Sequence, residues 1–292
     1  MGAAIILAAA FLFTGQGPAG QLPAPPRPAL EYTGTPLRLP LNCTNEGMIA
    51  AGLTCTEESP CNVFLELASV EALGARLIAT GNLHTSSSTL ASILLVSPDG
   101  GKTWSEPHER IPLAALDQIQ FFDFETGWVN GQVLHPLPGD PFFLLTNDGG
   151  ATWRRRPMFG ETRIGVIERF WFDSRTHGWL WLDRTQSGET GSEYERYESM
   201  TGGESWSVRE VTSKPIPVTG PAAVKREPGW RVRVDSKLRA FAIEQRTEKG
   251  WRRLAAFLVD VGECRPQATP PPQPPVETTT PPDSPLPKAE DK

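Results

Sequence analysis

The sequence predicts an all-β fold, a β-propeller of about four to five blades with four antiparallel strands in each blade. Three observations predict it. A short string with consecutive glycines and a final Trp recurs, and its tryptophans lie about 50 residues apart. A Gly-Trp pair recurs at nearly the same period. Between these motifs, apolar residues alternate in short runs bounded by Gly, Asn, Asp and Pro, the pattern of short strands. Units of this length with about four strands stack side by side in propellers.

The first 30 residues are expected to lie outside the folded domain. Residues 3–13 form an apolar run of the length found in signal peptides, too short to cross a bilayer, and Ala19 and Gly20 are small enough for a peptidase. We therefore expect a signal peptide over residues 1–20, a Pro-rich leader over residues 21–30, and a periplasmic or secreted protein with no membrane span. No positive charge precedes the apolar run, so the true translation start stays open.

The cysteines are Cys43, Cys55, Cys61 and Cys264, and an even number is typical of an oxidising compartment. Three pairings are possible. Our hypothesis is that Cys55 and Cys61 close a short loop, while Cys43 and Cys264 tie the first ordered segment to the last strand. Neither a CxxC pair nor a His at ligand spacing accompanies these thiols, so no metal site is expected.

The recurring strings are SPDGGKTW at residues 97–104, TNDGGATW at 146–153 and MTGGESW at 200–206. This pattern is typical of a tight hairpin turn, in which an Asp carboxylate accepts backbone hydrogen bonds, a Gly adopts positive φ, and the Trp folds back onto the sheet. Thr201 replaces the Asp in the third string, so that turn is expected to be looser. The residues given this structural role are Asp99, Gly101, Trp104, Asp148, Gly150, Trp153, Thr201, Gly203 and Trp206.

The second motif contains the pairs Gly127-Trp128 and Gly178-Trp179. A looser fourth unit runs over residues 230–251, and a leading unit around residues 63–81 supplies the strands before the first string. No segment has a capped helical stripe, except a possible short turn at residues 69–74. The folded domain is therefore expected to span residues 31–264. The tail, residues 265–292, is rich in Pro, Thr and Gln, which predicts a disordered segment.

The strings at residues 97–104 and 146–153 resemble the Asp-box (BNR repeat), S/T-x-D-x-G-x-T-W, of the sialidase-like propeller superfamily. With the segments around Gly127-Trp128 and Gly178-Trp179, residues 63–261 look most like propellers of the photosystem II assembly and stability factor type. The resemblance implies a binding scaffold, with the box at the blade periphery away from the ligand site. The resemblance specifies the fold and leaves the partner open.

A sialidase-like glycoside hydrolase is the alternative function. The resemblance implies that such enzymes use three arginines, a Tyr activated by a Glu, and an acidic Asp. Arg110 begins an R-I-P tripeptide of that family, but it follows the first string instead of preceding it. Of the tyrosines, Tyr32 falls in the predicted leader, while Tyr194 and Tyr197 alternate with Glu in what looks like an edge strand. We expect no enzymatic activity and no cofactor.

The net charge of -6 and the pI near 5.4 argue against a nucleic-acid partner. A protein or glycan of the cell envelope is the expected partner, bound by the long connections at residues 106–116, 133–140 and 185–195. The partner's identity, the exact blade count and whether the ring closes in one chain or by dimerising stay open.

Overall fold

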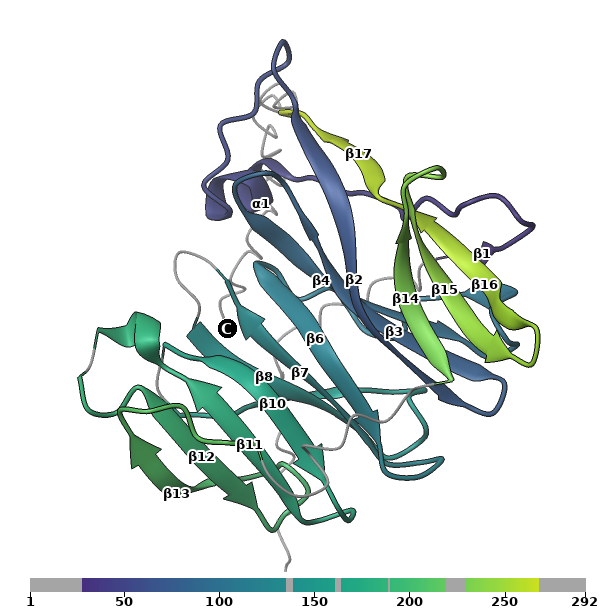
Figure 1. The fold of residues 1–292 in the computed structure, drawn as a ribbon. Coiled ribbons are helices and arrows are strands. Elements are labelled where there is room, and N and C mark those ends of the chain that lie inside the picture. The colour runs from purple at the N-terminus through teal and green to yellow at the C-terminus, as the bar shows by residue number, and fades with distance from the viewer. Residues whose placement is uncertain (1–27, 135–138, 161–163, 189, 219–228, 268–292) are drawn as a thin grey trace, which may run out of the picture.

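Four antiparallel sheets lie side by side in the chain (Figure 1). The computed structural model describes residues 28–134, 139–160, 164–188, 190–218 and 229–267. The predicted signal peptide, most of the Pro-rich leader and the tail beyond Gln267 lie outside these residues.

The first sheet has the order β17-β2-β3-β4, the second β6-β7-β8-β9, the third β10-β11-β12-β13, and the fourth β14-β15-β16. A short pair, β1 with β5, extends beside the first sheet. The strands are β1 (Leu30–Glu31), β2 (Cys61–Leu73), β3 (Arg76–His84), β4 (Thr89–Ser97), β5 (Thr103–Trp104), β6 (Ala114–Phe121), β7 (Gly127–Val133), β8 (Gly139–Thr146), β9 (Arg154–Pro157), β10 (Val166–Phe172), β11 (Gly178–Asp183), β12 (Tyr194–Ser199), β13 (Ser207–Thr212), β14 (Trp230–Asp235), β15 (Ala240–Thr247), β16 (Gly250–Leu258) and β17 (Asp260–Cys264).

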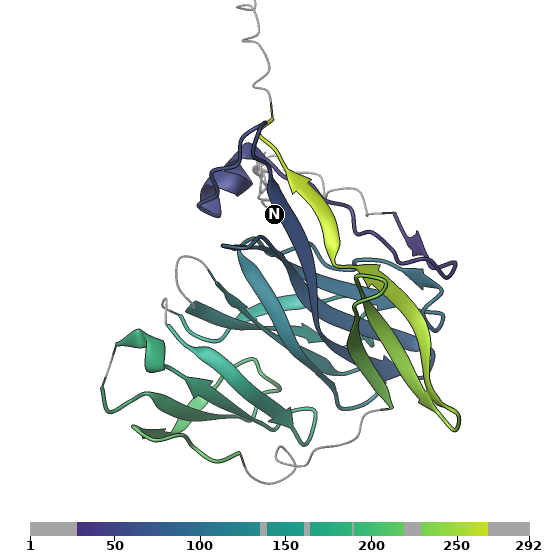
Figure 2. The ribbon, with the colours of Figure 1, turned by 45° about the horizontal axis from the view of Figure 1, so that its top comes forward.

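The sheets stack face to face through apolar cores. The fourth sheet packs on the first around Phe257 and Trp104, whose rings meet edge to face at 5.2 Å. The first packs on the second through β6, and the second packs on the third, where Trp128 stacks on Phe172 at 3.8 Å. The third and fourth sheets therefore lie at the two ends of the stack (Figures 1 and 2). The predicted all-β fold built from four-stranded antiparallel sheets is confirmed for three of the four sheets.

Both ends of the described chain complete sheets that are distant in sequence. β17 pairs with β2, with Cys264 opposite Cys61, so the last strand becomes part of the first sheet. Leu37 exchanges backbone hydrogen bonds of 2.8 Å with Ala256 and Leu258, so the N-terminal segment lines the free edge of β16. The fourth sheet has three strands of its own, and the segment at Leu37 extends it beyond β16.

Both cysteine pairs are bonded, Cys43 with Cys264 and Cys55 with Cys61. Of the three pairings open to the sequence, the structure thus holds the one that ties the N-terminal segment to β17. Two disulfides are typical of an oxidising, extracytoplasmic compartment. Among the described residues, no helix has the length and apolar composition needed to span a membrane.

The three recurring strings form the turns that follow β4, β8 and β12, which we call the repeat turns (residues 97–104, 146–153 and 199–206). In each turn two consecutive glycines have positive φ, for example 69° at Gly149 and 86° at Gly150. The N–H of Gly149 donates to Glu125 O at 2.8 Å, across to the turn between the first two strands of the same sheet. Gly100 and Gly202 make the equivalent bonds, which shows that each repeat turn anchors its own sheet.

The third repeat turn differs from the other two at its Trp. Trp104 and Trp153 each donate an indole N–H to the second glycine's carbonyl at 3.0 Å. The indole N–H of Trp206 is buried without an acceptor in the described chain. The carbonyl of Gly202 in this turn accepts instead from Trp128 of the second sheet, at 2.8 Å.

Three local predictions were wrong. Residues 69–74 belong largely to the long strand β2 and not to a helical turn; the helix is α1 (Asn45–Ala50), capped by Thr44, whose hydroxyl accepts from the N–H of Gly47 at 3.0 Å. Tyr32 is not in a loose leader, because its N–H donates to Lys102 O at 2.7 Å. β12 is no edge strand, since it pairs with both β11 and β13.

Candidate functional site

Two hollows open on either side of the hairpin that joins β3 to β4, residues 84–89. This hairpin lies at the start of β4, and the first repeat turn lies at its end. A strand of nine residues separates the two, which places the hollows roughly 25–30 Å from the repeat turn. The first repeat turn therefore shapes its sheet at a point remote from both hollows.

The first hollow, which we call the apolar hollow, has a volume of about 330 Å³. Helix α1, the β3–β4 hairpin, the loop before β6 and the Cys43–Cys264 disulfide form its walls. Aliphatic, proline and sulfur side chains dominate the lining. The lining residues are Pro28, Pro40, Leu41, Asn42, Cys43, Thr44, Gly47, Met48, Leu83, Leu90, Ala91, Arg110, Pro112 and Cys264.

Arg110 is the charged residue of this wall, and its charge is already matched. Its guanidinium donates two hydrogen bonds to Glu106, of 2.8 Å from Nε and 2.7 Å from Nη2. The two side chains are 10% and 4% exposed. Because breaking a buried ion pair is costly, Arg110 remains paired with Glu106. The apolar hollow therefore presents a nearly neutral surface.

The second hollow, which we call the polar hollow, has a volume of about 350 Å³ and lies on the other side of the same hairpin. Asn82 Nδ2 donates to Glu66 Oε2 at 3.2 Å. Nδ1 of His84 lies 2.9 Å from the carbonyl oxygen of Thr85, so it donates its proton there and leaves Nε2 as an acceptor in the neutral ring. The lining residues are Glu66, Asn82, His84, Thr85, Ser87, Ser88, Thr89 and Leu134.

Ser88 gives the polar hollow an unused hydrogen-bonding group. Its hydroxyl oxygen is buried and has no hydrogen-bond partner in the described chain. Buried polar atoms are almost always satisfied in folded proteins. This hydroxyl is therefore available to a ligand atom or an ordered water.

Two of the three predicted contact loops reach these hollows. Residues 106–116 contribute Arg110 and Pro112, and residues 133–140 contribute Leu134, while residues 135–138 lie outside the described residues. Leu134 N donates to Leu113 O at 2.7 Å, which joins the two loops. Residues 185–195 connect β11 to β12 of the third sheet, and those of them that the structure describes add no side chain to either hollow.

The Tyr–Glu pair considered for catalysis is formed inside a core. The hydroxyl of Tyr197 donates to Glu195, and Arg184 Nη1 donates to the same carboxylate at 2.8 Å. Tyr197 is 4% exposed and Glu195 is 2% exposed, between the second and third sheets. Tyr194, in contrast, lies on the opposite face of β12 beside Trp181.

Polar residues close to the two Gly-Trp pairs act in turns and between sheets. Asp123 Oδ1 accepts from the N–H groups of Glu125 and Thr126, and Oδ2 accepts from Arg175 at 2.7 Å. The bond from Thr126 leads the effects that lower the pKa of Asp123. His177 bridges Asp173 and Glu198, and the Glu198 bond is the largest cause of its raised pKa. Among the described residues, no group of three or more His, Cys, Asp or Glu side chains is arranged to hold a metal ion.

The sequence did not indicate either hollow. Leu83, Leu90 and Ala91 look like ordinary strand residues, and their role depends on α1 and the disulfide folding over them. The one local signal was Thr44, an N-cap residue followed closely by Glu46, which marks a helix start.

Comparison with known proteins gives a likeness of fold. No protein-family model and no curated protein matches the chain. One similar solved structure is the GH74 xyloglucanase from Xanthomonas campestris, with 14% identity, a TM-score of 0.34, and coverage of 46% of this chain and 18% of that chain. Another is YCF48 bound to D1 peptide, with 17% identity, a TM-score of 0.33, and coverage of 68% of this chain and 56% of that chain. The chain thus spans about a fifth and just over half of these two structures, and the likeness concerns fold alone.

Proposed function

We propose that this chain is an exported, non-catalytic binding module that holds an extended peptide segment of a protein partner at the two hollows beside the β3–β4 hairpin. The observation that carries the proposal is the apolar hollow, whose walls are Pro, Leu and Met and whose single arginine is neutralised by Glu106. Such a wall favours aliphatic or proline side chains, because burying them releases water without leaving a charge unpaired.

A peptide fits this pair of hollows better than a glycan does. A sugar presents hydroxyl groups on most of its faces, and these need several hydrogen-bonding partners when they are buried. The apolar hollow supplies Asn42 and Thr44 against a majority of apolar groups. An extended peptide instead places an apolar side chain in one hollow and polar groups next to Ser88 and His84 in the other.

The alternative, a sialidase-like hydrolase, has less support. The Tyr197–Glu195 pair lies in the core between two sheets, where a substrate cannot reach the phenol oxygen. Arg110 would have to leave Glu106 before it could hold a substrate carboxylate. Hydrolysis of any member of a panel of chromogenic glycosides by the purified chain would favour this alternative.

Selection from a displayed library of random peptides tests the binding proposal. We expect enriched peptides to carry Pro or Leu, and we expect their binding to fall at least tenfold in a Leu90→Arg variant, since the arginine fills the apolar hollow. Ile49→Arg is the matched control, because Ile49 is 77% exposed and lies next to the lining residue Met48. Enrichment of peptides that bind both variants equally, or of no peptides at all, would contradict the proposed site.

A further inference from the structure

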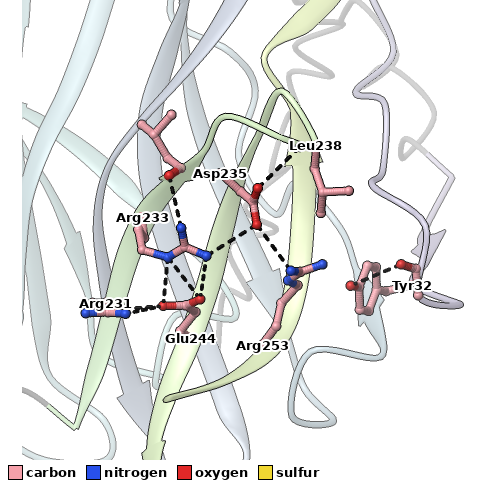
Figure 3. Close-up of polar contacts among 9 residues, drawn as sticks. Tyr32, Arg231, Arg233, Asp235, Leu238, Glu244 and Arg253 are labelled. Carbon is pink, nitrogen blue, oxygen red and sulfur yellow. Dashed lines mark hydrogen bonds and ion pairs between the residues drawn. The ribbon is translucent and has the colours of Figure 1, made fainter. Parts of the chain in front are cut away.

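The fourth sheet presents an arginine-rich face that packs on no other described sheet. Trp230 and Val232 of β14 turn into the core shared with the first sheet. The alternate residues, Arg231 and Arg233, therefore point to the opposite face (Figure 3). We call this surface the arginine end face, formed by Arg231, Arg233, Asp235, Glu244, Trp251 and Arg253.

The carboxylates of the arginine end face lie beneath its guanidinium groups. Arg231 binds Glu244 at 2.7 Å, Arg233 binds it at 3.1 Å, and Arg253 binds Asp235 at 3.2 Å (Figure 3). Glu244 and Asp235 are 7% and 12% exposed as side chains, whereas the three arginines are 36–41% exposed. Solvent therefore meets mainly positive charge here, in a chain whose net charge is -6.

The third sheet ends the stack on its other side with an aromatic face. Phe170, Phe172 and Leu180 pack on the second sheet, and the alternate residues point away from it. We call the resulting surface the aromatic end face, formed by Trp171, Trp179, Trp181 and Tyr194. Residues 214–218 cross part of it, with Ile216 and Val218 against the rings.

Negative charge gathers at one end of the aromatic end face. Asp183 lies directly opposite Tyr194 in the β11–β12 ladder. Burial, and then the charges of Asp183, Glu168 and Glu193, raise the pKa of Tyr194. A partner that supplies positive charge would complement this end of the face.

We propose that two copies of the chain close a ring head to tail, with the arginine end face of each copy against the aromatic end face of the other. Arginine stacks favourably on tryptophan, as Arg231 already does over Trp251 at 4.0 Å, and it pairs with carboxylates. Among the described residues, the packing that joins neighbouring sheets does not occur between the third and fourth sheets, so the described chain does not bring its own two end faces together. Two copies of the four-sheet stack would make a ring of about eight blades, within the range known for propellers, and twofold dimers are the commonest closed assemblies.

The mass of the full disulfide-bonded chain in solution, measured by light scattering across about 1–100 µM, tests this assembly. We expect a dimer that dissociates as salt is raised, because exposed charges are screened. Trp251→Glu places a negative charge on the arginine end face, and Glu168→Lys places a positive charge beside the aromatic end face; both sites are solvent-accessible. Each variant alone should be monomeric under conditions where the unchanged chain is a dimer.

A mixture of the two variants distinguishes the proposed geometry from a folding defect. In a head-to-tail ring, one interface of the mixed dimer joins the two altered faces, now with opposite charges, and the other joins two unaltered faces. The mixture should therefore recover the dimer, and Glu58→Lys, a charge change at a surface site outside both end faces, should leave it intact. A chain that is monomeric at all these concentrations, a dimer unaffected by either variant, or a mixture that stays monomeric would overturn the proposal.

Discussion

At the scale of single residues, the first two repeat turns are each stabilised by hydrogen bonds to one acidic side chain, Asp99 or Asp148. Asp148 Oδ1 accepts from Thr152 N at 2.9 Å and from Thr146 Oγ1 at 2.8 Å, and Oδ2 accepts from the Thr152 hydroxyl at 2.6 Å. Partial burial would raise the pKa of Asp148, but the bonds from Thr152 and Thr146 outweigh it and lower the pKa to about 2. The ionised carboxylate is thus the form that holds the turn.

Asp148→Asn is expected to lower the free energy of unfolding by about 1 kcal/mol at neutral pH, because charge-assisted bonds become neutral ones and one acceptor becomes a donor. The folded-state pKa lies below the ordinary value of 3.8. The contribution of Asp148 is therefore present above about pH 4 and is lost as the pH falls through about 2. Urea unfolding at about pH 7 and pH 2.5 measures this, with Glu58→Gln as an exposed control. A stability difference that is the same at both pH values would contradict it.

The residues of these turns could be predicted from sequence because the turn is local. Its donors, acceptor and positive-φ glycines all lie within eight consecutive positions. The burial of Tyr197 could not be predicted in the same way. In the stretch YERYES, each face of the strand carries one Tyr and one Glu. The pattern therefore does not indicate which face meets a neighbouring sheet.

At the scale of strands and sheets, the second and third sheets are joined by glutamine side chains that form the paired hydrogen bonds usually made by a backbone amide. Gln120 Nε2 donates to Phe172 O at 2.7 Å, and its Oε1 accepts from Phe172 N at 2.9 Å. Gln118 makes the same pair of bonds with Phe170. Two glutamines of β6 therefore hold the first strand of the next sheet as if they were part of a β-ladder. Sequence alone could not show this, since the partners are 52 residues apart.

Gln120→Leu is expected to destabilise the chain by about 2–4 kcal/mol, because it preserves side-chain bulk but leaves one N–H and one C=O of Phe172 without partners in a buried site. Gln120 is 7% exposed. Thermal or urea unfolding measures the effect, and Gln132→Leu at the half-buried end of β7 serves as the control. Equal stability of the two variants would show that water replaces the glutamine bonds.

At the scale of the whole molecule, the arrangement depends on the two chain ends meeting at the first and fourth sheets. The sequence predicted blades, because the second and third sheets each carry a repeat turn and a Gly-Trp pair, and the first sheet carries a repeat turn. It did not predict that β17 would join β2 or that Leu37 would extend β16, because these contacts bring together segments that share no motif. The number of strands in the first and fourth sheets thus depends on segments from the two ends of the chain, and one repeat unit alone does not determine it.

The two disulfides allow a measurement of how much the joining of the chain ends contributes to stability. Cys43–Cys264 spans a separation of 221 residues, and Cys55–Cys61 spans 6. Because a cross-link removes more unfolded-state entropy when its loop is longer, removing the first bridge should cost about 5 kcal/mol and removing the second about 2 kcal/mol. The pairs are matched in location, since Cys61 lies opposite Cys264 in the β2–β17 ladder. Urea unfolding of the two double Cys→Ala variants makes the comparison. If the two bridges proved equally stabilising, we would conclude that the strand contacts of β17 and Leu37 hold the chain ends together without help from the Cys43–Cys264 bridge.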